Sequence, residues 1–181
     1  ESLSKIPVEV ELASEFRYRD PLITGDDLVI LISQSGETID TLGALEEARK
    51  RGAVTISICN VVDSSIARRS DHVIYTHAGP EIGVASTKAF TTQLTALFLT
   101  AVYLGTKNGN LSKENSKRLI HELELLPNKI EKCLDLDARI REMAVKYCHN
   151  EYFFHLGRGI DYPIALEGAL KLKEISYIHA E

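Results

Sequence analysis

A short stretch rich in hydroxyl groups follows the most apolar run near the start of the chain. Residues 28–32 read Leu-Val-Ile-Leu-Ile, and residues 33–38 read Ser-Gln-Ser-Gly-Glu-Thr. The first run predicts a strand buried on both faces, and a helical pattern follows from about Asp40 to Arg51. The loop between them gathers free amides and the hydroxyls of Ser33, Ser35 and Thr38 at a helix N-terminus, which suits a phosphate. Alternatively, one hydroxyl simply caps the helix.

A second loop of this kind covers residues 78–90, which read Ala-Gly-Pro-Glu-Ile-Gly-Val-Ala-Ser-Thr-Lys-Ala-Phe. It opens a long apolar helix predicted from Ala89 to Leu104. Either Ser86 and Thr87 only cap this helix, or the segment brings a second set of amides and hydroxyls to the same crevice. The sequence leaves both interpretations open.

Three charged side chains near the end of the chain could move a proton. Glu167, Lys171 and Glu174 are spaced by four and then three residues, so on a helix they share one face. A carboxylate held beside a lysine in a partly dry cleft is suited to general-base catalysis. The alternative is a surface ion-pair ladder, worth about 0.3–0.5 kcal/mol per pair.

The elements that position these residues alternate between strand and helix. Apolar runs predict strands at 28–32, 53–58 and 72–76, with helical patterns between them, and a half-exposed strand is predicted at 8–12. This order predicts an α/β fold with a doubly wound parallel sheet, in which ligands bind beyond the carboxyl ends of the strands.

The later part of the chain is predicted to be mostly helical. Residues 112–147 form charged helices interrupted at Pro127 and at residues 135–137. A strand then begins at 152–156, and a helix runs from about Tyr162 to the end of the sequence. A second α/β unit therefore begins near residue 149.

Composition limits the class of protein. The 181 residues are 44% hydrophobic and 26% charged, which is typical of a globular chain, and the net charge of −5 predicts no nucleic-acid or membrane partner. Residues 89–104 are too short and too polar to span a bilayer, so a buried helix is expected there. Cys59, Cys133 and Cys148 lack metal-site spacing, which predicts reduced thiols and no bound metal.

Three motifs taken together resemble one family. Residues 33–38, 81–91 and 165–175 are similar to the isomerase (sugar isomerase, SIS) region of the glutamine–fructose-6-phosphate aminotransferases, also called glucosamine-6-phosphate synthases. The resemblance implies flavodoxin-like SIS subdomains. We expect most of the first at 1–110, connecting helices at 111–148 and the start of the second at 149–181. Because the sequence begins with Glu and stops within a predicted helix, we expect a fragment of a longer polypeptide.

The resemblance also implies roles for individual residues. Glu174 matches the glutamate that moves a proton between carbons 1 and 2 of the open-chain sugar imine, and Lys171 and Glu167 match its charged neighbours. Val84 and Ser86 match positions that line the sugar site. The sugar phosphate would be bound by Ser33, Gln34, Ser35 and Thr38.

The implied activity is formation of glucosamine 6-phosphate from fructose 6-phosphate and glutamine, with no cofactor. The resemblance further implies a glutaminase domain on the same polypeptide, a homodimer and a cytoplasmic location. Other parts of the family's site would lie outside these residues, so the fragment alone is expected to lack catalysis. One alternative is a non-catalytic SIS domain that senses a phosphosugar, and another is a different phosphosugar isomerase or deaminase. A serine hydrolase is not favoured, because Ser35 is not in a Gly-x-Ser-x-Gly motif.

Overall fold

The computed structural model describes residues 1–83 and 85–181, which form two compact units. The first unit comprises Glu1–Ile82 and Ser86–Lys117, and the second comprises Gly83–Ala85 and Arg118–Glu181. The finer division at 1–110, 111–148 and 149–181 stays a prediction.

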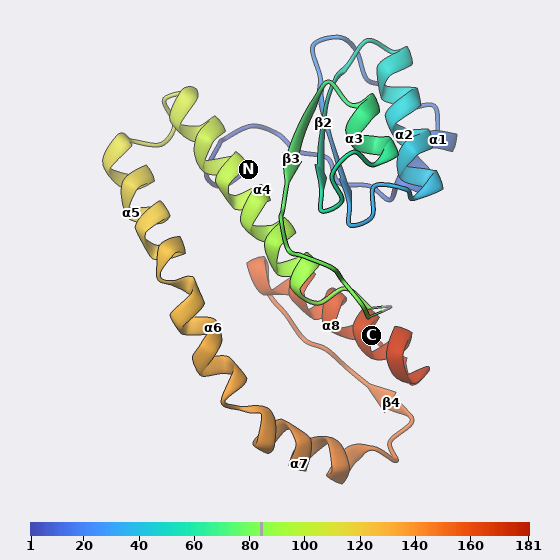
Figure 1. Cartoon of the computed structure of the whole chain (residues 1–181), viewed down its shortest axis with the longest axis vertical. Coiled ribbons are helices and arrows are strands. Elements are labelled where there is room, and N and C mark those ends of the chain that lie inside the picture. The colour runs from blue at the N-terminus through green and yellow to red at the C-terminus, as the bar shows by residue number, and fades with distance from the viewer. Residues whose placement is uncertain (84) are drawn as a thin grey trace. The chain divides into compact units, whose positions relative to one another are not determined.

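The first unit is built on a three-stranded parallel sheet in the order β1-β2-β3 (Figure 1). The strands are β1 (Leu28–Ser33), β2 (Val54–Cys59) and β3 (His72–Tyr75). Ser33 lies opposite Cys59, and Cys59 lies opposite Tyr75, so the three strands end at the same level. The residues that follow them therefore meet at one edge of the sheet, as in other parallel α/β folds.

Helices lie on both sides of this sheet (Figure 1). One side carries α1 (Ala13–Tyr18), α2 (Ile39–Lys50) and α3 (Ser65–Arg69), and the other carries α4 (Lys88–Lys107). The predicted α/β fold with a parallel sheet is confirmed. Each connection from β1, β2 and β3 leads into a helix, so helix N-termini gather at the carboxyl edge.

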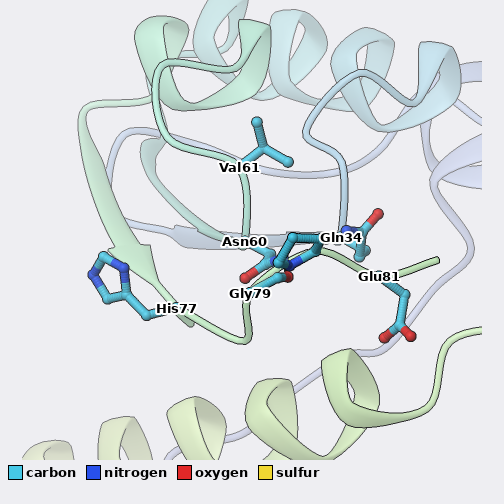
Figure 2. A pocket seen from close by; sticks show the side chains of 7 residues that line it. Gln34, Asn60, Val61, His77, Gly79 and Glu81 are labelled. Carbon is cyan, nitrogen blue, oxygen red and sulfur yellow. The ribbon is translucent and has the colours of Figure 1, made fainter.

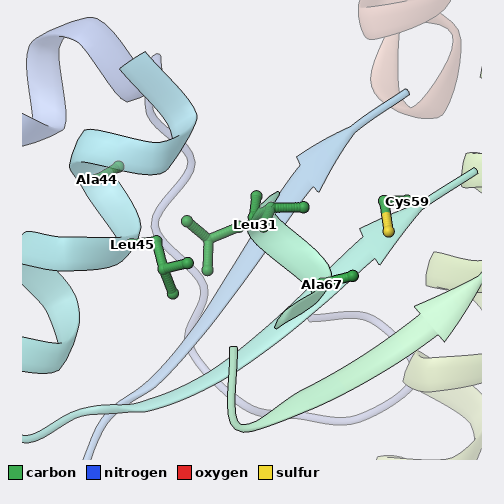
Figure 3. Packing of buried hydrophobic residues seen from close by; sticks show 6 residues of the cluster. Leu31, Ala44, Leu45, Cys59 and Ala67 are labelled. Carbon is green, nitrogen blue, oxygen red and sulfur yellow. The ribbon is translucent and has the colours of Figure 1, made fainter. Parts of the chain in front are cut away.

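The core of the first unit lies between the sheet and the helices α2 and α3 (Figure 3). Leu45 of α2 is fully buried and points towards Leu31 of β1. Short side chains elsewhere allow the helices to approach the sheet closely. The buried cluster consists of Leu31, Ala44, Leu45, Cys59, Ile66 and Ala67.

The helix α4 is less buried than the sequence predicts. It buries one stripe of small residues, whereas Leu94, Leu99 and Tyr103 are 41%, 42% and 60% exposed. By length and composition it is the one described helix that could cross a membrane. This is weak support for a membrane span, because core helices of soluble proteins have the same length and composition. The lack of a membrane or nucleic-acid partner stays a prediction.

The second unit contains successive helices and a small two-stranded sheet. The helices are α5 (Lys113–Glu124), which begins in the first unit, α6 (Leu126–Leu134), α7 (Asp137–Tyr147) and α8 (Tyr162–Ser176). The breaks between α5, α6 and α7 fall next to Pro127 and at residues 135–136, where the sequence predicts them. Between α7 and α8 lie β4 (Tyr152–Phe153) and the 3-10 turn η1 (Gly159–Asp161), and β5 (His179–Ala180) follows α8.

Three local predictions are wrong. Residues 8–12 form no strand, and the strand predicted at 152–156 is only the two residues of β4. The last helix does not run to the end, because Tyr177 adopts a left-handed conformation with φ of 59°. The residues beyond it form β5, which pairs in parallel with β4. That pairing joins segments more than twenty residues apart, so local periodicity does not reveal it.

Candidate functional site

The loop after β1 is folded back on itself by its own hydroxyl groups. Ser33 Oγ accepts a hydrogen bond from the backbone N–H of Gly36 at 3.0 Å and lies 3.1 Å from Oγ1 of Thr38. Ser35 Oγ accepts the N–H of Glu37 at 3.2 Å. The three hydroxyls predicted to bind an anion are therefore held in one short turn.

This arrangement bears on the two interpretations of the loop. Thr38 is the residue that precedes α2, yet its side chain makes no capping hydrogen bond to the helix. Its hydroxyl is paired with Ser33 instead. The first N–H groups of α2 therefore lack the side-chain cap that a Ser or Thr at this position usually provides. Simple capping by Thr38 is therefore not observed, and the anion-binding role of this loop stays a prediction.

The loop is also anchored to the neighbouring helix α3. The carbonyl oxygen of Gly36 accepts the N–H of Ile66 at 3.0 Å, and the carboxylate of Glu37 accepts the N–H of Ser65 at 2.7 Å. Hydrogen bonds from Ser65 lower the pKa of Glu37. Gly36 has φ of +69°, and a Cβ there would lie 2.5 Å from Cβ of Ser64 and 2.9 Å from Cγ2 of Ile66. Only glycine fits this backbone without strain.

A hollow of about 510 Å³ opens at the carboxyl edge of the sheet (Figure 2). Of the predicted binding residues, Gln34 lines it, whereas Ser33, Ser35, Thr38 and Ser86 are not among its lining residues. The lining consists of Gln34, Asn60, Val61, His77, Gly79, Pro80 and Glu81.

Asn60 organises this hollow, and the sequence analysis missed it. Its backbone N–H donates to the carbonyl oxygen of Gln34 at 3.1 Å. Its side-chain oxygen accepts the hydroxyl of Thr76 at 3.2 Å and the N–H of Ala78 at 2.7 Å, and its side-chain nitrogen donates to the carbonyl oxygen of Gly79 at 2.7 Å. Asn60 thus joins the loops that follow all three strands. The signal in the sequence is a polar residue directly after a buried strand.

The N-terminus of α4 is occupied by a side chain of this protein. The carboxylate of Glu81 accepts the N–H of Ala89 at 3.0 Å, the N–H of Thr87 at 3.4 Å and the hydroxyl of Thr87 at 3.2 Å. The hydrogen bond from Ala89 is the largest of the effects that lower the pKa of Glu81. Glu81, and not Thr87 itself, therefore caps this helix. Ser86, which precedes Thr87 in the sequence, is half-buried, and Val84 lies outside the described residues.

In the second unit, the spacing prediction for α8 is confirmed. Lys171 Nζ lies 3.2 Å from Oε1 of Glu167 and 2.7 Å from Oε2 of Glu174. The side chains of Lys171 and Glu167 are 24% exposed and that of Glu174 is 36% exposed, so the cluster is partly sheltered from water. Burial lowers the pKa of Lys171, but the bonds to Glu174 and Glu167 outweigh it and raise this pKa overall. The lysine therefore stays an ammonium beside both carboxylates.

A tight turn places this helix. A Cβ on Gly157 would collide with the carbonyl oxygen of Asp161, so the chain can turn here only because residue 157 is glycine. The turn η1 follows, and Pro163 lies in the first turn of α8, where its missing N–H removes no helical hydrogen bond. The glycines around Arg158 thus serve the turn into α8.

The chain is similar to known proteins along its whole length. A family model described as SIS domain matches residues 1–103. The glutamine–fructose-6-phosphate aminotransferase (isomerizing) of Clostridium tetani is 55% identical over 181 residues, which are 100% of this chain and 30% of that protein. The corresponding protein of Chlorobaculum tepidum is 54% identical over the same length, 29% of its own. The chain thus spans about 30% of the length of these curated relatives.

Two solved structures extend the comparison. The C-terminal domain of glucosamine-fructose-6-phosphate aminotransferase from Francisella tularensis is similar with a TM-score of 0.96 and 47% identity, over 99% of this chain and 51% of that one. Glucosamine-6-phosphate deaminase from Thermotoga maritima is similar with a TM-score of 0.63 and 25% identity, over 93% of this chain and 49% of that one.

Proposed function

This chain belongs to the SIS-domain family, and on that premise we propose that it is the isomerase region of a glutamine–fructose-6-phosphate aminotransferase. The complete protein would convert fructose 6-phosphate and glutamine to glucosamine 6-phosphate and glutamate. This region would bind the hexose phosphate and convert the ketose skeleton to the aldose.

The phosphate would be held at the loop between β1 and α2. The hydroxyls of Ser33, Ser35 and Thr38 are gathered there at a helix N-terminus that has no side-chain cap. Gln34 borders the hollow next to this loop and would contact the same phosphate or the adjoining sugar carbon. Neutral donors and a helix dipole are together sufficient to bind a phosphate dianion. Val84 and Ser86 would line the sugar.

The proton transfer would be carried out by Glu174. A carboxylate base removes a proton from carbon 1, the electron pair forms the double bond between carbons 1 and 2, and the imine electrons move to nitrogen, which takes up a proton. The resulting enolamine then takes up a proton at carbon 2 and loses its hydroxyl proton, which leaves the aldehyde. Lys171 would fix the position of Glu174 and supply a positive charge beside it, and Glu167 holds Lys171 from the other side.

The cluster of Glu167, Lys171 and Glu174 is the observation that carries this proposal. A protein that only senses a phosphosugar needs the phosphate loop, but it needs no base beside a lysine. A deaminase related in fold stays the nearest alternative enzyme. The names of relatives that are 54–55% identical over the length of this chain favour the aminotransferase.

The partners and the location follow from the same proposal. A glutaminase domain of the same polypeptide would supply the nitrogen, and the functional protein would be a homodimer in the cytoplasm. Cys133 and Cys148 are exposed, and all three cysteines are free thiols, which fits a reducing compartment.

The test uses the full-length protein that carries this chain. Glu174→Gln should abolish formation of glucosamine 6-phosphate while fructose 6-phosphate still binds, because only the proton acceptor is removed. Glu142→Gln is the matched control, since Glu142 is an exposed carboxylate on α7. Near-normal turnover of the Glu174→Gln protein would refute the assignment of the base.

A second variant tests the phosphate contact. Thr38→Ala should weaken the binding of fructose 6-phosphate more than that of unphosphorylated fructose. Equal weakening for both sugars would show that the loop does not hold the phosphate.

A further inference from the structure

The N-termini of α2, α3 and α4 lie at the carboxyl edge of the sheet in the first unit, and they differ in one respect. The N-terminus of α2 has no side-chain cap, whereas the carboxylate of Glu37 accepts an N–H at the start of α3 and the carboxylate of Glu81 fills the N-terminus of α4. A helix N-terminus attracts negative charge, so an uncapped one is available to an anionic ligand and a filled one is not. The edge therefore offers one place for an external anion.

Glu81 also forms part of the wall of the hollow that Gln34 borders (Figure 2). The hydrogen bonds from Ala89 and Thr87 lower its pKa, so it carries a full negative charge at neutral pH. A second anionic group placed in this hollow would meet that charge at short range. Two like unit charges a few ångströms apart at a protein surface weaken binding by about tenfold or more.

The same carboxylate can still accept a hydrogen bond. A carboxylate has about four acceptor sites, and Glu81 uses three of them on Thr87 and Ala89. One acceptor site is thus left for a ligand hydroxyl, such as that of a polyol. A neutral sugar chain would therefore be accepted where an acidic one is rejected.

We propose that Glu81 is a specificity-determining residue that restricts the site to sugars with a single anionic group, the phosphate, and a neutral polyol chain. This inference rests on the proposed function, since it assumes that the phosphate lies at α2. It adds to that function the expectation that bisphosphates and phosphorylated sugar acids are excluded. It also predicts the orientation of the ligand: the phosphate end lies at the β1–α2 loop, and the hydroxyl-bearing chain extends towards Glu81.

The experiment compares two open-chain ligands of nearly equal size in the full-length protein. Sorbitol 6-phosphate has a neutral first carbon, whereas 6-phosphogluconate has a carboxylate there. We expect calorimetry to show that the unmodified protein prefers sorbitol 6-phosphate by about tenfold or more. Glu81→Gln should reduce this preference by about tenfold and change the affinity for sorbitol 6-phosphate much less, because it removes the charge and keeps the shape.

Thr87→Ala is the matched control. It removes one hydrogen bond at the start of α4 but leaves the charge of Glu81 in place, so the preference should not change. An unchanged preference in Glu81→Gln, or an equal change in Thr87→Ala, would overturn the inference while fructose 6-phosphate binding continues to support the proposed function. If the unmodified protein binds neither fructose 6-phosphate nor sorbitol 6-phosphate, the proposed function fails, and this inference fails with it.

Discussion

Replacing Gly36 by alanine is the most direct test of the loop geometry. The residue has φ of +69°, and a left-handed conformation costs an L-residue about 1–2 kcal/mol. The added Cβ would also lie 2.5 Å from Cβ of Ser64 and 2.9 Å from Cγ2 of Ile66, both buried residues, and overpacking of this kind costs about 1–3 kcal/mol. We therefore expect Gly36→Ala to lower the free energy of unfolding by about 2–5 kcal/mol.

Urea denaturation measures this change. With a slope of about 2 kcal/mol per M, the midpoint should fall by roughly 1–2.5 M. Gly79→Ala is the matched control, because Gly79 has φ of +73° but no described atom lies within 4 Å of its Cβ position. It should show only the conformational part, about 1–2 kcal/mol. If Gly36→Ala lowers stability no more than Gly79→Ala does, the close approach of this loop to α3 is refuted.

Three further predictions concern the sheet and its core. Ser57→Ala should raise the free energy of unfolding by about 1 kcal/mol, because the buried Ser57 hydroxyl has no partner among the described residues. Thr55→Val should lower this free energy, because Thr55 exchanges hydrogen bonds with Asp71. Urea denaturation checks both, since the two variants should shift the midpoint in opposite directions. The hydrogen bonds from Thr55 lower the pKa of Asp71, so the stabilising effect of the Asp71 carboxylate is complete above its ordinary pKa of 3.8 and is lost as the pH falls through the lowered pKa. Asp71→Asn should therefore flatten the acid side of a curve of unfolding free energy against pH. An unchanged curve would contradict this. Leu45→Ala should lower the free energy of unfolding by about 2–5 kcal/mol, because Leu45 is fully buried. The control Ile39→Ala, at a 77% exposed position, should change this free energy by no more than about 0.5 kcal/mol in thermal or urea unfolding.

Elements with a strong local pattern could be predicted from the sequence. The apolar run at 28–32 gives β1, and Gly52, with φ of +83°, ends α2 where the pattern places a stop. The breaks of the helices near Pro127 and residue 135 follow from local residue preferences in the same way. The last strand, β5, could not be predicted, because its two residues become a strand only by pairing with β4. The alternation at 8–12 predicted a strand that finds no partner strand in the described part of the chain.

The candidate site shows the same division between local and long-range information. The face shared by Glu167, Lys171 and Glu174 depends only on helical spacing, and it could be predicted. The roles of Asn60 and Glu81 depend on which loops meet at the edge of the sheet, so a one-dimensional pattern did not reveal them. Asn60 follows a strand directly and Glu81 follows one after a short loop. This position after a strand is the only signal of their roles in the sequence.

The proposed function requires a chain with a net charge of −5 to bind a phosphate. Among its lining residues, all of which the structure describes, there is no lysine or arginine. In the proposed function the attraction would come from the hydroxyls and backbone amides of the β1–α2 loop next to the hollow and from the dipole of α2, which act only within a few ångströms. A site of this kind gathers anions weakly from a distance but discriminates strongly by geometry once they arrive. In such a weak field a single fixed carboxylate has a large effect, and Glu81 is the one acidic residue in that wall.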